Sequence, residues 1–290
     1  MSESKTKVAI VGGGPAGIAA SQQCTREGID DVLLLERKNI GGLIYQANRI
    51  ENFPGFVGKE GREMVNELGT IVSEYDIDVE FREVEKIESA RDGFKLITET
   101  GKVRTTYLIL ATGTAPRSLG FEGEVHHPEW RNYDGESVIV IGGGDAAYDY
   151  ALRMKRLGGD VTILRRSEPK ALPVLVREAR EKGIEEVEAS LEEVEKDDDF
   201  SLRCDGMDLR ADVVVTAIGR DPRFPDLDFD MDPEEVSFPS GQTKFDDLFV
   251  IGSSVLGTYR QTSLCWGMGI AAGMDLGRKI SSCEKSKNME

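Results

Sequence analysis

The stretch VAIVGGGPAGIAA at residues 8–20 recurs later in the chain as VIVIGGGDAAYDY at residues 138–150. In each copy an apolar, β-branched run enters a glycine-rich turn, which is followed by a helical stretch and a second apolar strand. That second strand is LLLER at residues 33–37 in the first copy and TILRR at residues 162–166 in the second. Strand, glycine turn, helix and strand make a βαβ unit, so the repeat predicts an α/β protein built from two similar domains.

Later strands close each of the two units. The segments YLILATGTAPR (107–117) and VVVTAIGRDPR (213–223) are both apolar strands that end in a glycine turn. A third strand, LFVIGSS (248–254), fits the first unit if the second unit is inserted into it. Proline and glycine mark the two crossings. We therefore expect two Rossmann-like, three-layer ββα nucleotide-binding domains, one formed by residues 1–115 and 242–290 and the inserted one by residues 116–241.

The composition excludes several classes of protein. The 290 residues carry 53 Asp and Glu against 36 Lys and Arg, and the net charge of −17 opposes binding to nucleic acid. No apolar run approaches the roughly 18 residues of a membrane span, and the start MSESKTK is too polar for a signal peptide, so we expect a cytoplasmic protein without a membrane partner. The four cysteines, Cys24, Cys204, Cys265 and Cys283, have neither Cys-x-x-Cys nor metal-site spacing, so no metal is expected.

The first glycine turn has the pattern of a dinucleotide-binding site. Gly12 allows the tight turn, Gly14 lets the backbone approach a pyrophosphate, and Gly17 admits close helix packing. The amides at the start of the following helix then face the phosphates. Glu36 ends the next strand, where its carboxylate can accept hydrogen bonds from ribose hydroxyls. An exposed acid without a ligand is the alternative, but the complete strand, helix and acid context favours the ribose role.

The second glycine turn differs at the end of its next strand. GxGxxA from Gly142 repeats the pyrophosphate pattern, but Arg165 and Arg166, with Lys170 shortly after, stand where the first copy has Glu36. Guanidinium groups can bind a 2′-phosphate in a bidentate manner, whereas a carboxylate repels it. The basic residues therefore favour NADPH over NADH.

Further segments show a family resemblance. GGL from Gly41 and ENFPG from Glu51 look like the flavin-embracing loop of thioredoxin reductases, which are FAD/NAD(P)-dependent pyridine nucleotide-disulfide oxidoreductases. ATG from Ala111 looks like the glycine turn of that family, and Arg260 with Gln261 resembles the pair that opens its last helix beside the flavin. The resemblance covers nearly the whole chain in order. It implies FAD in the first domain, NADPH in the second, and a homodimer.

The resemblance and the motifs together give two sets of candidate cofactor-binding residues. For FAD they are Gly12, Gly14, Pro15, Ala16, Gly17, Glu36, Arg37, Gly41, Gly42, Leu43, Asn52, Val84, Ala111, Thr112, Gly113, Gly252, Ser253, Arg260, Gln261 and Thr262. For NADPH they are Gly142, Gly144, Asp145, Ala146, Ala147, Arg165, Arg166, Lys170, Ile218 and Gly219.

Two positions depart from the resembled family. Its last strand normally ends in Gly-Asp, with the aspartate bonding the ribityl chain of the flavin, whereas this chain has Gly252 and Ser253. We expect a neutral hydroxyl in place of the carboxylate to lower FAD affinity by roughly 1–2 kcal/mol. Leu164 replaces a histidine that often precedes the basic pair of the family.

The largest departure concerns the redox dithiol of the family. Its Cys-x-x-Cys precedes the second glycine turn, and the matching positions here read Val125, His126, His127 and Pro128. Valine and proline cannot attack or resolve a disulfide, so ordinary thioredoxin reduction by this chain alone is not expected. His126 and His127 are candidate proton donors because imidazole titrates near neutral pH, although surface histidines in a loop are the commoner case. Cys265 is a candidate redox thiol, with inert packing as the alternative.

Three functions are consistent with these residues. The first is an NADPH-dependent FAD oxidoreductase that delivers electrons to a carrier protein, such as a ferredoxin-like protein, or to a small acceptor. A flavoprotein group that resembles ferredoxin-NADP reductase also lacks the dithiol, and its GGGDSA-type turn is close to GGGDAA from Gly142. The second is a disulfide reductase that uses Cys265 or the thiols of a partner. The third is a flavin-bound sensor or assembly module with an inactive NADPH site.

Overall fold

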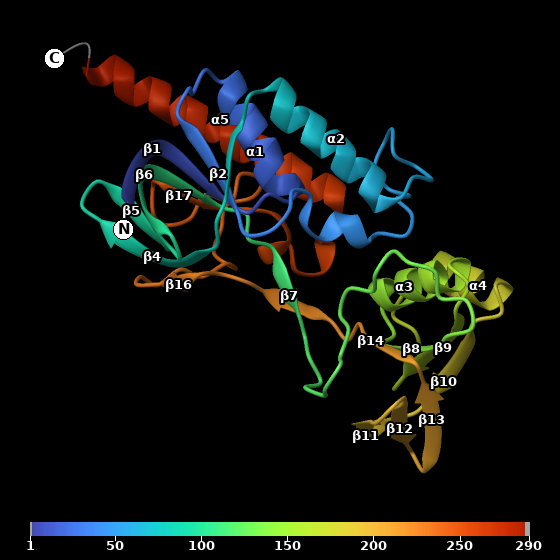
Figure 1. Cartoon of the computed structure of the whole chain (residues 1–290). Helices are drawn as coiled ribbons and strands as arrows, with labels where there is room; N and C mark the ends of the chain where they lie inside the picture. Colours follow the sequence, from blue (N-terminus) through green and yellow to red (C-terminus); the bar gives the residue numbers. More distant parts are fainter. Residues whose placement is uncertain (1, 288–290) are drawn as a thin grey trace. The chain divides into compact units, whose positions relative to one another are not determined.

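The computed structural model describes residues 2–287, which fold into two compact units (Figure 1). Within that range the first unit contains residues 2–45, 50–114 and 222–287, and the second contains residues 46–49 and 115–221. Two short strands, β7 (Thr114–Pro116) and β15 (Arg220–Pro222), pair with each other where the chain leaves the first unit and returns to it.

The first unit combines a mostly parallel sheet with three α-helices. In chain order it consists of β1 (Ser2–Val11), α1 (Pro15–Arg26), β2 (Val32–Glu36), the 3-10 helix η1 (Gly42–Gln46), α2 (Gly61–Glu74), β3 (Asp78–Phe81), β4 (Val84–Ala90), β5 (Gly93–Thr98), β6 (Gly101–Leu110), β16 (Asp226–Leu227), β17 (Leu248–Val250), the 3-10 helices η2 (Gly252–Ser254) and η3 (Gly257–Tyr259), and α5 (Thr262–Lys287). The strands are ordered β16-β4-β5-β6-β1-β2-β3, and β17 pairs with the end of β6. The last strand of the chain thus joins the sheet that the first strand begins.

The two faces of the parallel part of this sheet (β3, β2, β1, β6 and β17) are covered by different elements, one of which is the antiparallel extension of the sheet through β5 and β4. Val8 and Ile10 of β1 share one buried cluster with residues of α1 and α5. Ala9 and Val11 share another with residues of the antiparallel strands β4 and β5. Alternate residues of a strand point to opposite faces, so an uninterrupted apolar run is what a strand buried on both sides requires. Figure 1 shows α1, α2 and α5 on one side of β1, β2 and β6, and the antiparallel strands β4 and β5 on the other.

Close packing of α1 and α5 depends on glycine. A Cβ at Gly269 of α5 would lie 2.2 Å from the carbonyl oxygen of Ala16, and a Cβ at Gly273 would lie 2.7 Å from the side chain of Gln23. Both distances are too short for non-bonded atoms, so these positions admit only hydrogen where the helices approach. Across residues 2–287 we found no helix with the length and apolar character needed to span a membrane.

The second unit repeats the same plan. Its elements are β8 (Ser137–Ile141), α3 (Asp145–Arg156), β9 (Asp160–Arg165), α4 (Pro173–Glu181), β10 (Glu185–Glu188), β11 (Leu191–Lys196), β12 (Phe200–Cys204), β13 (Met207–Ala211) and β14 (Val213–Thr216). The parallel sheet has the order β10-β9-β8-β14, and β11, β12 and β13 form a separate antiparallel sheet.

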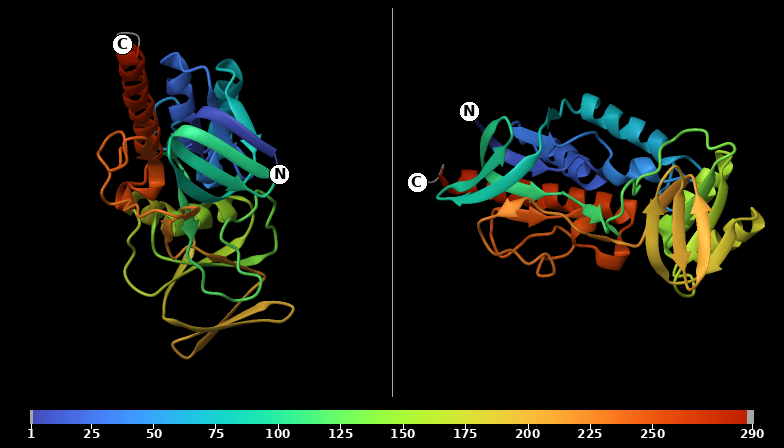
Figure 2. Two further views of the ribbon diagram at one scale, coloured as in Figure 1. Left: turned by 90° about the vertical axis from the view of Figure 1, so that its left-hand side faces the viewer. Right: turned by 60° about the horizontal axis from the view of Figure 1, so that its bottom comes forward.

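The layers of the second unit follow from its sequence in the same way. Val138 and Val140 of β8 lie in a cluster with residues of α3, whereas Ile139 and Ile141 lie in a cluster with residues of β12. Figure 2 shows the β11–β13 sheet, in yellow to orange, on the side of the parallel sheet away from α3 and α4. Each unit therefore has three layers, and the Rossmann-like ββα fold expected from the repeat is confirmed.

The return of the chain to the first unit lies earlier than the proline and glycine signals suggest. Those signals place it near residue 241, but residues 222–241 belong to the first unit. Within this segment β16 pairs in parallel with β4, and Phe229 packs against Phe94 with ring centroids 5.8 Å apart. The segment therefore packs with the antiparallel strands of the first unit and does not belong to the inserted unit.

A polar cluster of the second unit fixes residues 46–49 to α3. The fully buried Arg153 donates from Nη1 to the carbonyl oxygen of Gln46 at 2.8 Å. Asp149, one turn earlier on α3, accepts the backbone N–H of Asn48 at 2.8 Å. Burial raises the pKa of Asp149 to about 6, against the lowering effect of the backbone N–H groups and of Arg153. The folded protein therefore favours the protonated form of Asp149 more than the unfolded chain does.

We expect Asp149→Asn to change how stability depends on pH. Because the pKa of Asp149 is raised on folding, its contribution is present at low pH and is lost as pH rises through about 6. The free energy of unfolding of the natural protein should therefore fall, relative to that of the variant, by about 1–2 kcal/mol between pH 5 and pH 8. Urea denaturation of both proteins at each pH measures this difference, in which other titrating groups cancel. A difference that is the same at both pH values would contradict the assignment.

Candidate functional site

The turn between β1 and α1 has the geometry of a pyrophosphate cradle. Gly12 adopts φ +112°, and a Cβ there would lie 2.3 Å from the carbonyl oxygen of Ala111. A Cβ at Gly17 would lie 1.9 Å from the carbonyl oxygen of Gly12, so the helix must approach the turn at a glycine. Gly14 is different, because nothing lies within 4 Å of a Cβ built on it. Two glycines thus serve the fold of the protein, and the third leaves space at the N-terminus of α1.

Glu36 lies beside this turn at the end of β2. Its Oε2 accepts the backbone N–H of Gly13 at 2.7 Å, and its Oε1 accepts that of Lys38 at 2.9 Å. Each carboxylate oxygen can accept a further hydrogen bond, so both can still receive a ribose hydroxyl. The acid is therefore held in place by the backbone that it adjoins, ready for a ligand at the turn.

A cavity of about 170 Å³ opens beside Glu36, entirely within the first unit. Five of the FAD candidates line it, namely Gly12, Glu36, Arg37, Val84 and Thr112. The cavity joins the glycine turn to the acid at the end of β2, as the adenosine half of a dinucleotide requires. The residues present therefore fit FAD.

Part of the cavity wall was not identified from the sequence. Arg223, Phe224, Pro225 and Asp226 line the cavity, together with Arg82, Glu83 and Glu85 near the start of β4. Arg223 donates its backbone N–H to the carbonyl oxygen of Gly113 at 3.0 Å. Its carbonyl oxygen accepts the hydroxyl of Thr112, and its guanidinium pairs with Glu83. Arg223 thus links the ATG turn to the β4 side of the cavity.

Several other FAD candidates are brought together away from this cavity. Gly41 donates its N–H to the carbonyl oxygen of Gly13 at 2.8 Å, and the side-chain amide of Asn52 donates to Gln261. The hydroxyl oxygen of Ser253 would lie 3.3 Å from a Cβ at Gly113. The candidates that do not line the cavity are Gly14, Pro15, Ala16, Gly17, Gly41, Gly42, Leu43, Asn52, Ala111, Gly113, Gly252, Ser253, Arg260, Gln261 and Thr262.

The second glycine turn, between β8 and α3, repeats the geometry of the first. Gly142 adopts φ +151°, and a Cβ there would lie 2.4 Å from the carbonyl oxygen of Ala217. Gly144 again has nothing within 4 Å of a built Cβ. The carbonyl oxygen of Gly143 accepts the backbone N–H of Lys170 at 2.7 Å, which places the loop after β9 next to the turn. The second unit therefore has a glycine turn of the same geometry as the first.

Two of the three expected cations near this cradle are free. Arg166 and Lys170 are exposed, and no ion pair forms with either of them among the described residues. Arg165 is instead 11% exposed and paired with two acids of β10. The other NADPH candidates lie around the turn, with Asp145, Ala146 and Ala147 opening α3 and with Ile218 and Gly219 following β14. Arg165 is thus engaged in ion pairs, whereas Arg166 and Lys170 are not.

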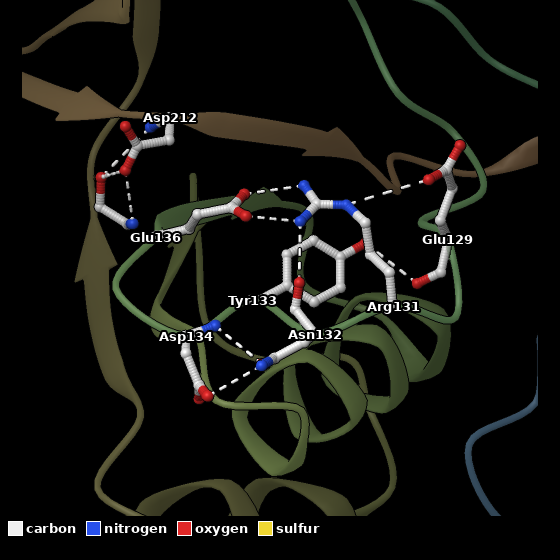
Figure 3. A network of polar contacts seen from close by, with 8 residues as sticks. Glu129, Arg131, Asn132, Tyr133, Asp134, Glu136 and Asp212 are labelled. Atoms are coloured by element: carbon white, nitrogen blue, oxygen red, sulfur yellow. Dashed lines mark hydrogen bonds and ion pairs between the residues drawn. The ribbon is translucent and has the colours of Figure 1, made fainter.

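His126 and His127 lie in the second unit, in the loop before β8. His126 Nε2 is 3.8 Å from a carboxylate oxygen of Glu124, and its Nδ1 is buried with no hydrogen-bond partner in the described chain. His127 is exposed. The backbone that follows is fixed by an ion-pair network, in which Arg131 bridges to Glu136 at 2.5 Å and covers the ring of Tyr133 (Figure 3). The histidines thus precede a segment whose side chains are joined by these contacts.

The cysteines are all single thiols. Cys24 and Cys204 are buried, Cys265 is partly buried, and Cys283 is exposed. Burial raises the pKa of Cys265 to about 11 and that of Cys24 to about 12. A thiol with such a pKa is almost entirely protonated at neutral pH and is a weak nucleophile. Over residues 2–287 no three histidine, cysteine or acidic side chains gather as a metal site would need.

Two Rossmann-like units in one chain, each with a glycine turn of this geometry and with opposite charges on the last residue of the second strand, define an oxidoreductase that binds two nucleotides. A family model described as pyridine nucleotide-disulphide oxidoreductase matches residues 6–269. The chain belongs to that family, as an NAD(P)H-dependent FAD oxidoreductase of thioredoxin reductase type with FAD and NADPH as cofactors.

Individual relatives agree with this membership over their full lengths. The thioredoxin reductase of Mycolicibacterium smegmatis is 29% identical over 309 residues, which cover 97% of this chain and 99% of that protein. The crystal structure of T. acidophilum thioredoxin reductase has a TM-score of 0.84 at 23% identity, with 95% of this chain and 98% of that chain covered. For Lactococcus lactis thioredoxin reductase the TM-score is 0.83 at 25% identity, with 94% and 98% covered.

Proposed function

We propose that this protein passes electrons from NADPH through FAD to an acceptor outside the chain, without using a dithiol of its own. The observation that carries the proposal is the residue set at positions 125–128, which is Val-His-His-Pro. The cysteines offer no substitute, because burial raises the pKa of Cys24 and of Cys265, Cys204 is buried in the second unit, and Cys283 is a single exposed thiol on α5. A disulfide relay needs an attacking thiolate and a resolving thiol.

On the flavin side, the chain supplies binding and orientation. The amides at the start of α1 face the pyrophosphate, Glu36 accepts the ribose hydroxyls, and Ser253 beside Gly113 offers a hydroxyl to the ribityl chain. Arg260 and Gln261 precede α5, whose N-terminus favours negative charge that develops on the pyrimidine end of the ring. When bound, FAD supplies the redox chemistry by accepting a hydride and passing electrons on.

On the nicotinamide side, the second cradle binds the pyrophosphate and the exposed cations bind the 2′-phosphate. The amides at the start of α3 serve the pyrophosphate, and Gly144 leaves the space for it. Arg166 and Lys170 are free to neutralise the 2′-phosphate. This pair of sites supports NADPH as the electron donor.

The acceptor is a carrier protein, such as a ferredoxin-like protein, or a small molecule. The GGGDAA turn from Gly142 supports this proposal through its likeness to ferredoxin-NADP reductase-like flavoproteins. His126 and His127 are the proposed proton donors. We also propose a homodimer, from the resemblance, and a cytoplasmic location, from the sequence. Sedimentation of the holoenzyme measures the oligomeric state.

Two alternatives make different predictions. A disulfide reductase that uses Cys265 needs a reactive thiolate, and the raised pKa of Cys265 is unfavourable to it, whereas one that uses the thiols of a partner needs no cysteine here. A sensor or assembly module with an inactive NADPH site would keep its flavin oxidised in the presence of NADPH. Each alternative is separated from the main proposal by one measurement.

We expect anaerobic NADPH to bleach the flavin absorption band of the purified protein, and Cys265→Ser to leave the rate of bleaching within about twofold, because a protonated thiol takes no part. Stopped-flow spectroscopy measures the rate. Reoxidation by ferredoxin, by a quinone and by oxidised thioredoxin then identifies the acceptor class. Flavin that stays oxidised with saturating NADPH and NADH would overturn the proposal, and thiol release that disappears in the Cys265→Ser variant would establish the internal disulfide reductase.

A further inference from the structure

Arg165 is held by acids that belong to the neighbouring strand. The strands β9 and β10 are parallel, and their register places Glu188 opposite Arg165. Arg165 Nε lies 3.0 Å from Glu186 Oε2, and Arg165 Nη1 pairs with Glu188. Nη1 also donates to the carbonyl oxygen of Ser167 at 3.0 Å. The guanidinium is therefore occupied on two sides by carboxylates and on a third by the backbone.

The two acids have different surroundings. Glu186 is 8% exposed and also receives the hydroxyl of Tyr148 at 2.9 Å and Arg180 Nε at 2.6 Å. The Arg180 hydrogen bond in particular keeps the pKa of Glu186 below its usual range, so it is ionised. Glu188 is 51% exposed, and within residues 2–287 its ion-pair partner is Arg165 alone. Glu186 thus belongs to the interior of the unit, whereas Glu188 stands at the strand end in contact with solvent.

The first unit shows what is unusual in this pairing. There the strand-end residue that faces the ribose is Glu36, and the register places the apolar Phe81 opposite it. In the second unit the corresponding pair is Arg165 and Glu188. The second unit therefore carries a cation at the end of one strand and a carboxylate at the end of the next, where a 2′-phosphate would be bound.

We propose that Glu188 is a specificity-determining residue that weakens the preference of the second unit for 2′-phosphorylated nucleotides. It does so by holding Arg165 in an ion pair and by placing a negative charge beside the phosphate, so that Arg166 and Lys170 provide the recognition. The inference rests on the binding of NADPH proposed above. As a consequence, the preference for NADPH over NADH is smaller than it would be if Arg165, Arg166 and Lys170 were all free to bind the phosphate.

Nucleotide fragments test this without any electron transfer. Isothermal titration calorimetry of the holoenzyme at 0.1 M salt gives the Kd of 2′,5′-ADP, which carries the 2′-phosphate, and of its isomer 5′-ADP, whose second phosphate extends the 5′-phosphate instead. We expect Glu188→Gln to tighten 2′,5′-ADP binding about 5- to 10-fold, since a freed charge-assisted hydrogen bond is worth roughly 1–2 kcal/mol. The Kd of 5′-ADP should change less than about twofold, because that ligand has no 2′-phosphate to take the place of Glu188 on the Arg165 guanidinium.

The matched control is Glu185→Gln, at the other end of the same strand. It removes the same charge about 10 Å away, which is one Debye length at 0.1 M salt. Because Glu185 is exposed, the Glu185→Gln substitution should leave both Kd values unchanged. Arg166→Gln is the positive control and should weaken 2′,5′-ADP binding at least about tenfold without affecting 5′-ADP.

The outcomes separate this inference from the proposed function. The preference for the 2′-phosphate is the Kd of 5′-ADP divided by the Kd of 2′,5′-ADP. If Glu188→Gln leaves this ratio unchanged while Arg166→Gln lowers it, the proposed role of Glu188 is wrong and the NADPH site stands. If the natural protein binds neither fragment, or if Arg166→Gln has no effect, the NADPH site itself is wrong. Equal tightening by Glu185→Gln and Glu188→Gln would assign the effect to net charge and would also overturn the inference.

Discussion

Gly12→Ala is expected to destabilise the first unit by about 3 kcal/mol or more and to yield a protein that retains no FAD. The added Cβ would lie 2.3 Å from the carbonyl oxygen of Ala111, and φ +112° is a conformation that residues with a side chain rarely adopt. Backbone strain and overpacking each contribute roughly 1–3 kcal/mol. Chemical denaturation followed by circular dichroism measures the loss, and the ratio of flavin to protein absorbance measures retained FAD.

Gly14→Ala and Gly69→Ala separate the fold from the ligand. Gly14 has space around it, so alanine there should change the free energy of unfolding of the apoprotein by less than about 1 kcal/mol. It should weaken FAD binding, because the new methyl group would occupy the space next to which the pyrophosphate binds. Gly69 lies within α2 with equal space, and alanine there should be neutral or stabilising. Equal loss of stability in the Gly12 and Gly14 variants would refute the division of roles.

Only part of the cavity in the first unit can be predicted from the sequence. Gly12 and Glu36, which line the cavity, could be predicted to lie together because their positions depend on neighbours within one βαβ unit, where spacing sets the geometry. The wall made by residues 223–226 could not, because it depends on the pairing of the two-residue strand β16 with β4. So short a strand leaves no periodic signal, while Gly241 suggests a boundary that the packing of Phe229 overrides.

Arg165 shows the same limit at the second cradle. Its place at the end of β9 follows from the repeat, and the structure has it there. Its ion pairs could not be predicted, because they depend on the register of β10, which lies beyond α4 in sequence. Charge at a strand end is readable from sequence, but whether that charge is free for a ligand is decided by tertiary contacts.

Gly144→Ala is expected to slow flavin reduction by NADPH at limiting concentrations about 10- to 100-fold while the protein keeps its fold and its FAD. Nothing lies within 4 Å of a Cβ at Gly144, which caps α3 at φ −100°, so alanine meets neither a steric clash nor a strained backbone in the free protein. In the nucleotide complex the methyl group would stand between the α3 amides and the pyrophosphate. Overpacking of roughly 1–3 kcal/mol at that contact corresponds to the expected range.

Anaerobic stopped-flow reduction over a series of NADPH concentrations measures the effect, with reduction of the same flavin by dithionite as the internal control. Dithionite needs no nucleotide cradle, so its rate should equal that of the natural protein. Gly142→Ala should behave differently, because its Cβ would lie 2.4 Å from the carbonyl oxygen of Ala217. This substitution should lower the free energy of unfolding of the second unit. If Gly144→Ala were reduced by NADPH at the natural rate, the pyrophosphate would not lie over α3, and the inserted unit would have to bind its nucleotide elsewhere.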